Sequence, residues 1–114
     1  MHELSIAQAL VEQVEAARLA NGGGRVISVD VRIGEWRQVV PEILTSYFDH
    51  LSQGTPLEAA RIEIVRVEAT ARCADCAQVF TLDDIFLVCP TCGSRGCALL
   101  TGRELELIGL ELDD

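Results

Sequence analysis

Four of the five cysteines stand in two C-x-x-C pairs, an arrangement that can hold a metal ion. Cys73 and Cys76 form the first pair, twelve residues follow, and Cys89 and Cys92 form the second. Two residues between ligands allow a tight turn to point both sulfurs at one centre. Four soft thiolates at tetrahedral geometry favour Zn²⁺ in a closed, structural site. The spacing therefore predicts a structural zinc site.

Iron held by four thiolates, ordinary buried thiols and disulfides are the alternatives that the cysteines leave open. We expect a cytoplasmic protein, because the N-terminus lacks the basic patch and apolar stretch of a secretion signal. No run approaches the roughly eighteen apolar residues of a membrane span either. Cytoplasmic thiols stay reduced, so the pairs favour a metal over disulfides. Cys97 has no paired neighbour and is predicted to pack as a small hydrophobic residue.

The second candidate for metal chemistry is His2, one of only two histidines. A polar residue beside a terminus is ordinarily just solvated, and the helix dipole adequately explains Glu3 near a helix start. An imidazole joined to the backbone nitrogens of the terminal residues nevertheless forms a compact chelate. Such nitrogen ligands fit the square-planar preference of Ni²⁺ or Cu²⁺. The residues alone leave His2 open between these two interpretations.

The elements that must position these residues follow from hydrophobic periodicity. Apolar residues recur at helical spacing from Leu4 to Ala17, and NGGG at residues 21–24 supplies a stop. Ser5, followed three places later by Gln8, fits a capping box in which each side chain satisfies an unpaired backbone N–H. The first helix is therefore predicted to begin there, with residues 1–3 ahead of it.

Three strands and a second helix complete the predicted elements. The run RVISVDVRIG predicts a strand whose buried face carries Ile27, Val29, Val31 and Ile33. The run VVPEILTSYFDHLSQG predicts a helix that starts at Pro41, a residue suited to a first helical position. Two further strands, RIEIVRVEAT and ELELIGLEL, stand on either side of the cysteine block.

This order predicts an α+β fold, in which a small domain of two helices and an antiparallel sheet carries an inserted four-cysteine zinc-ribbon domain. The last strand returns to complete the sheet begun upstream. We expect the first domain to comprise residues 1–69 and 101–114, and the zinc-binding domain to comprise residues 70–100.

The charge balance argues against a nucleic-acid partner. Acidic residues outnumber basic ones by 18 to 9, which gives a formal net charge of −9 at pH 7. A zinc-ribbon protein that binds DNA or RNA normally presents a basic face, because phosphate neutralisation supplies most of the non-specific affinity. An enzyme is also disfavoured, since no nucleophile is evidently paired with a base.

Several motifs together resemble a known family. They are the N-terminal MHELSIAQALVEQV, then VRIGEW and VVPEIL, the two C-x-x-C pairs with CPTCGS at the second, and TGRELEL. The chain resembles the hydrogenase nickel-incorporation proteins of the HypA/HybF family. The resemblance covers essentially the whole chain, and the combination of an N-terminal MHE with this cysteine spacing is highly specific.

The resemblance implies a nickel metallochaperone and not an enzyme. It implies that His2 is the nickel ligand, that Glu3 contributes a backbone nitrogen or positions the site, and that the four paired cysteines hold zinc. The implied partners are a HypB-like GTPase and the large-subunit precursor of a [NiFe] hydrogenase. No partner nucleic acid and no membrane span are expected.

One departure from the family pattern limits the transfer. Some relatives carry histidines beside the cysteine pairs that respond to pH or assist nickel binding, and this sequence has none there. The other histidine, His50, falls in the second predicted helix and is expected to face solvent or a polar contact. The competing hypothesis is a zinc-ribbon module for protein interaction, in which MHE is incidental.

Overall fold

The computed structural model describes residues 2–82 and 86–113. The chain forms two compact units. The first, here called the helical unit, comprises Met1–Arg32, Val39–Val65 and Glu106–Asp114; the second, the cysteine unit, comprises Ile33–Gln38 and Arg66–Leu105.

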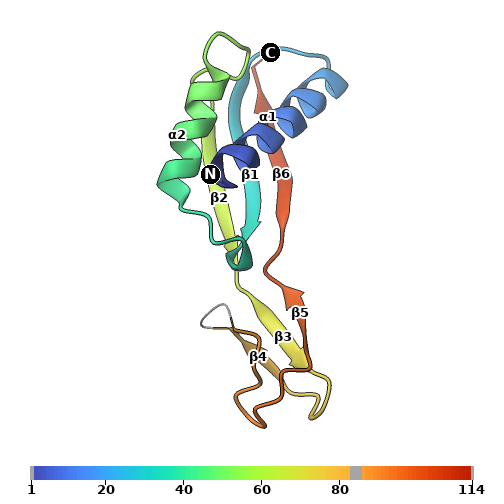
Figure 1. Ribbon diagram of the computed structural model, residues 1–114. Coiled ribbons are helices and arrows are strands. Elements are labelled where there is room, and N and C mark those ends of the chain that lie inside the picture. Colours follow the sequence, from blue (N-terminus) through green and yellow to red (C-terminus); the bar gives the residue numbers. More distant parts are fainter. Residues whose placement is uncertain (1, 83–85, 114) are drawn as a thin grey trace. The chain divides into compact units, whose positions relative to one another are not determined.

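The helical unit contains two helices and a three-stranded sheet. Helices α1 (His2–Ala20) and α2 (Pro41–Ser52) pack against each other, and the sheet has the order β2-β1-β6 (Figure 1). Strands β1 (Val26–Gly34), β2 (Arg61–Val67) and β6 (Leu105–Leu112) come from three separate parts of the chain. The buried core of this unit includes Ile6, Ala7, Leu10, Val14, Val29, Val31, Leu44 and Phe48.

Strand β6 closes the sheet by returning beside β1. The Ser28 hydroxyl donates to the Glu111 carboxylate at 3.2 Å, and the guanidinium of Arg32 lies 3.6 Å from the carboxylate of Glu106. The pairs advance in opposite directions along the two strands, so β6 runs antiparallel to β1. The predicted return of the last strand to the sheet is confirmed.

The predicted start of the first helix was wrong. Helix α1 already begins at His2, so His2 and Glu3 belong to its first turn, while Met1 lies outside the described residues. Ser5 is not a cap, because its hydroxyl donates to the His2 carbonyl at 2.9 Å from inside the helix. A serine in a first turn can bond back to the main chain in this way, and an acidic side chain there favours the helix dipole.

The buried face of β1 differs from the predicted one at its first residues. Val29, Val31 and Ile33 are buried as expected, but Ile27 is 40% exposed and Val26 is buried instead. Val26 and Val29 are both buried although two residues separate them, which breaks the strict alternation of a strand. The inward face of β1 therefore changes phase ahead of Val29.

The cysteine unit contains a smaller antiparallel sheet of order β4-β3-β5. Its strands are β3 (Thr70–Cys73), β4 (Val79–Thr81) and β5 (Cys97–Thr101), and a 3-10 helix, η1 (Glu35–Arg37), belongs to the same unit. Its hydrophobic cluster has only Ala69, Ala71 and Leu82 at its centre. Partly buried side chains pack around them: Trp36, Phe80, Leu87, Cys97 and Leu99. Such a core is too small to contribute much stability by itself.

Two glycines allow backbones to meet at the edge of this core. A Cβ on Gly34 would lie 1.9 Å from the carbonyl oxygen of Gly102. Gly102 has φ +121° and would itself place a Cβ 2.8 Å from the Cα of Ala69. Neither position can hold a side chain without displacing backbone, so both glycines are required by the packing.

The fold class predicted from the sequence is confirmed: two helices, antiparallel strand pairing and an inserted unit with four clustered cysteines. Within the described residues, neither helix combines the length and the apolar character needed to cross a membrane.

The core of the helical unit gives a first prediction. Leu10 is fully buried on α1, whereas Leu19 on the same helix is 62% exposed. Leu10→Ala should lower the free energy of unfolding by about 2–5 kcal/mol, because it removes buried methyl groups and leaves a cavity. Leu19→Ala, the matched control, should change it by less than about 0.5 kcal/mol. Urea unfolding followed by far-UV circular dichroism measures both, and equal losses would contradict the assigned core.

Candidate metal centre

The first cysteine pair is held in a tight turn at the end of β3. The Cys73 carbonyl accepts the Ala77 N–H at 2.9 Å, and the Cys73 N–H donates to the Gln78 carbonyl at 2.9 Å. Ala77 adopts a positive φ of 63° to complete the turn. These bonds orient the main chain so that Cys73 and Cys76 project to the same side.

The second pair repeats the pattern of the first. The Cys89 carbonyl accepts the Gly93 N–H at 2.8 Å, and the Cys89 N–H donates to the Ser94 carbonyl at 2.9 Å. Gly93 has φ 75° and so occupies the position that Ala77 has in the first turn. The two turns therefore present their sulfurs with the same local geometry.

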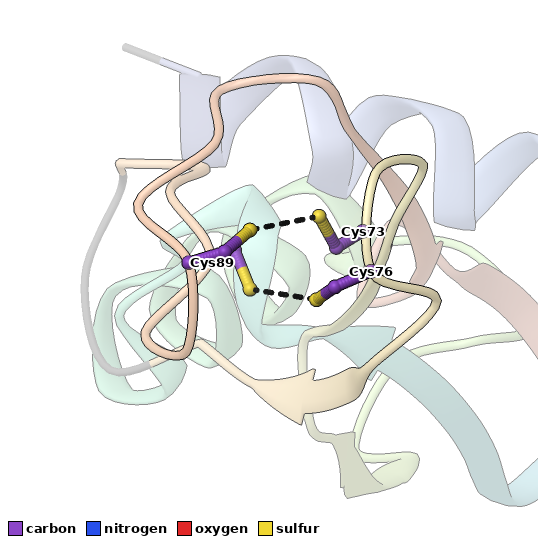
Figure 2. Close-up of side chains that lie close together, drawn as sticks. Cys73, Cys76 and Cys89 are labelled. Carbon is purple, nitrogen blue, oxygen red and sulfur yellow. Dashed lines mark hydrogen bonds between the residues drawn. The ribbon is translucent and has the colours of Figure 1, made fainter.

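The two turns bring all four predicted cysteines into one cluster. The Cys73 and Cys92 sulfurs lie 3.6 Å apart, as do those of Cys76 and Cys89 (Figure 2). All four sulfurs lie within 4.8 Å of one another. A tetrahedron with metal–sulfur bonds of about 2.3 Å has edges of about 3.8 Å. The cluster thus has the size and donor chemistry for one tetrahedral ion.

The first cysteine of each pair is buried and the second is exposed. The pKa of the Cys73 thiol is lowered to about 6 because the Cys76 N–H donates to its sulfur. The pKa of the Cys89 thiol is lowered chiefly by the Cys92 N–H. The Ser94 N–H acts to lower the pKa of the Cys92 thiol. Hydrogen bonds with neighbouring cysteine sulfurs, chiefly that of Cys73, and burial outweigh this effect and raise the pKa to about 12. A metal ion therefore displaces protons here, and binding weakens on acidification.

Cys97 packs beside the cluster without joining it. It begins β5 opposite Cys73, and its thiol donates to the Ser94 carbonyl at 3.6 Å. Burial is the main cause that raises the pKa of this thiol, which keeps it protonated. Cys97 is also one of the side chains around the buried residues of the cysteine unit. This packing agrees with the small hydrophobic role predicted from its unpaired position.

The predicted nickel residues lie in the helical unit, at the start of α1. The His2 side chain is 50% exposed, and its Nδ1 lies 3.5 Å from a carboxylate oxygen of Glu3. Glu3 is only 7% exposed. Its other carboxylate oxygen accepts the backbone N–H of Val40, the residue that caps α2, at 3.2 Å.

The hydrogen bond from Val40 is the main cause that lowers the pKa of Glu3. A lowered pKa means that the carboxylate is ionised at neutral pH and that its contribution to folding is lost as the pH falls. Sequence reasoning attributed Glu3 to the dipole of its own helix and missed this contact. No local signal could reveal it, because the two residues stand 37 positions apart.

The remaining histidine, His50, is exposed on α2 as predicted. Among the described residues, the four cysteines form the one group of three or more histidine, cysteine or carboxylate ligands close enough to share an ion. A nickel site at His2 would therefore rely on backbone nitrogens for its further ligands. The first N–H groups of a helix lie outside its i→i−4 hydrogen-bond ladder, and α1 begins at His2.

Comparison with known sequences identifies relatives over the whole length. A sequence model of the family described as hydrogenase/urease nickel incorporation, metallochaperone, HypA matches residues 1–112. The hydrogenase maturation factor HypA of a Roseiflexus species is 44% identical over 115 residues, which cover 100% of this chain and 94% of the relative. That of Geotalea uraniireducens is 39% identical over 113 residues and covers 99% of this chain and 100% of the relative.

Solved structures show a similar fold. The solution structure of the Ni metallochaperone HypA from Helicobacter pylori matches with a TM-score of 0.71 and 26% identity, over 96% of each chain. A second solution structure of a HypA protein matches with a TM-score of 0.69 and 27% identity, over 98% of this chain and 96% of the other.

The matched turns of the metal centre give a second prediction. A non-glycine residue in the left-handed region costs about 1 kcal/mol, and Ala77 pays this cost where the other turn has Gly93. Ala77→Gly should therefore raise the stability of the cysteine unit by up to about 1 kcal/mol, part of the gain being offset by the more flexible unfolded chain.

Ala74→Gly, in the same turn but without a positive φ, is the control. It should lower stability by about 0.5–1 kcal/mol. Trp36 belongs to the cysteine unit and is the sole tryptophan of the sequence, so its fluorescence during urea unfolding reports on this unit. A loss of stability in Ala77→Gly as large as in the control would contradict the assigned strain.

Proposed function

The chain belongs to the HypA family of hydrogenase and urease nickel-incorporation metallochaperones, and on this basis we propose that it captures Ni²⁺ at its N-terminus for delivery to the large subunit of a [NiFe] hydrogenase. The observation that carries the proposal is the exposed imidazole of His2 at the first residue of α1, next to a carboxylate fixed by Val40. We propose that the protein acts by binding and transfer and not as an enzyme.

His2 is the proposed nickel ligand, through its ring and the adjoining amides. Because α1 begins at this residue, the amides of His2 and Glu3 can serve a metal without breaking the helical ladder. Nitrogen ligands of this kind suit Ni²⁺ in a square plane, although Cu²⁺ competes by affinity. Met1, which precedes His2, lies outside the described residues.

Glu3 has a separate proposed role, which is to position the site. Its carboxylate holds the start of α1 against the start of α2 through the Val40 N–H. The neighbouring imidazole stays on the surface, half exposed. An open site of this kind releases its ion more readily than a closed thiolate cage does, and a delivery protein must release its metal.

The four-cysteine cluster is the proposed structural zinc site. The sulfur separations fit a tetrahedral thiolate centre, and all four ligand positions come from the protein, which leaves none for a substrate. Zinc would link the two turns and supply folding energy to a unit with a small core. We propose that zinc stays with the protein while nickel is its cargo.

The proposed partners are a HypB-like GTPase and the hydrogenase large-subunit precursor. The acidic composition, with a net charge of −9, favours encounter with basic patches on proteins and disfavours nucleic acid.

The zinc assignment predicts one zinc ion per chain in the purified protein. Cys73→Ser and Cys92→Ser, one from each turn, should lose the ion and unfold the cysteine unit, since three thiolates no longer complete the site. Cys97→Ser should keep the native zinc content, because this thiol donates to a carbonyl beside the cluster. Elemental analysis measures the zinc content, and Trp36 fluorescence reports the unfolding of the cysteine unit. A loss of zinc in Cys97→Ser would mean that the four ligands are wrongly assigned.

The nickel assignment predicts that His2→Ala abolishes tight nickel binding. Zinc content and the melting temperature should stay near native, because an exposed terminal side chain leaves no cavity. The nickel affinity is measured by titration with Ni²⁺, monitored by calorimetry and by the visible absorption of square-planar nickel.

His50→Ala is the matched control, because it removes the other exposed histidine and should leave nickel affinity native. Glu3→Gln should weaken nickel binding less than His2→Ala does, because an amide oxygen can still accept the Val40 N–H. If His2→Ala binds nickel with native affinity and spectrum, the N-terminal site is refuted and a zinc-ribbon interaction module becomes the better explanation.

A further inference from the structure

Ser94 connects the two cysteine turns outside the sulfur cluster. Its carbonyl accepts the Cys89 N–H at 2.9 Å and the Cys97 thiol at 3.6 Å, which closes the second turn. Its hydroxyl donates to the carboxylate of Asp75, which stands between the two cysteines of the first pair. A single residue therefore closes its own turn through the main chain and reaches the other turn through its side chain.

Gly96 adds two hydrogen bonds to this connection. Its N–H donates to the Ser94 hydroxyl oxygen at 3.0 Å, and its carbonyl accepts the Ala74 N–H at 2.9 Å. A Cβ at Gly96 would lie 3.4 Å from the Ser94 oxygen and 3.9 Å from an Asp75 oxygen. Both distances are ordinary van der Waals contacts, so this segment lies beside the serine and the carboxylate without crowding them.

We propose that Ser94 and Asp75 are positioning residues of the metal centre, whose mutual hydrogen bond sets how fast zinc leaves the protein. The inference rests on the proposed zinc site and extends it beyond the four thiolates. Ser94 and Asp75 do not touch the ion in this assignment. They act through the turns that carry its ligands.

The pattern of hydrogen bonds explains why this contact controls release. Each pair is fixed internally by its own turn bonds, from Ala77 in the first turn and from Gly93 in the second. Release of an ion held by two rigid pairs therefore requires the two turns to separate. The bond between the Ser94 hydroxyl and the Asp75 carboxylate joins the two turns and must break when they separate.

A charged acceptor makes this bond stronger than one between neutral groups. Partners of metal ligands typically change metal affinity by about 10–100-fold when they are mutated. Asp75 is exposed to solvent, so we expect an effect at the lower end of this range. Affinity differences between variants of one site lie mostly in the dissociation rate, so release should become about tenfold faster without the bond.

The test is zinc transfer from the zinc-loaded full chain to excess 4-(2-pyridylazo)resorcinol, followed by absorbance. Ser94→Ala and Asp75→Ala should each release zinc about tenfold faster than the native chain. The double variant should be no faster than Ser94→Ala alone, since Ser94→Ala already removes the bond to Asp75 together with the bond from the Gly96 N–H. Ser94→Thr keeps a hydroxyl and should restore slow release.

Thr91→Ala is the control, because it changes an exposed side chain between the cysteines of the second pair. It should release zinc at the native rate. Native rates in both Ser94→Ala and Asp75→Ala, or effects that simply add in the double variant, would overturn the inference while leaving the zinc site intact. A native chain that contains no zinc would instead refute the zinc assignment on which the inference rests.

Discussion

The convergence of four sulfur atoms is the constraint on which the cysteine unit depends. Its hydrophobic cluster has two alanines and a leucine at its centre, and its three strands are only 3–5 residues long. Apolar burial of this size cannot offset the entropy of ordering some forty residues by itself, since fixing each backbone costs roughly 1–2 kcal/mol. Two near-identical turns compensate for the low stability of this core, because they bring four sulfurs together at separations that suit one metal ion.

The helical unit is stabilised by an apolar core, and this core also fixes the positions of residues on its surface. Leucine, valine and phenylalanine side chains fix two helices on a sheet, so the first turn of α1 has a defined place. Glu3 fastens that turn through the main chain of Val40. His2 can therefore be exposed and still have a defined position, because its neighbour Glu3 is buried. Fixing the position of His2 costs little free energy, because the helix and the core that hold it are already formed.

The sequence predicted what depends on local pattern and missed what depends on distant contacts. Alternating isoleucines and valines located β1, and paired cysteines located the metal centre, because each signal lies within a few residues. The start of α1 was misplaced since Ser5 can bond either as a cap or back to a carbonyl, and its sequence is the same in both cases. The bond from Glu3 to α2 joins elements that only the tertiary fold brings together.

The unequal burial of the paired cysteines has a chemical consequence. Cys73 and Cys89 are buried, whereas Cys76 and Cys92 are exposed residues. Peroxide therefore approaches one exposed cysteine in each turn, and its oxidation of that thiolate to a sulfenic acid removes one donor. The enclosed sulfur of the same turn is left intact. Exposure thus favours oxidation of Cys76 and Cys92, and a reducing thiol can reverse its first step.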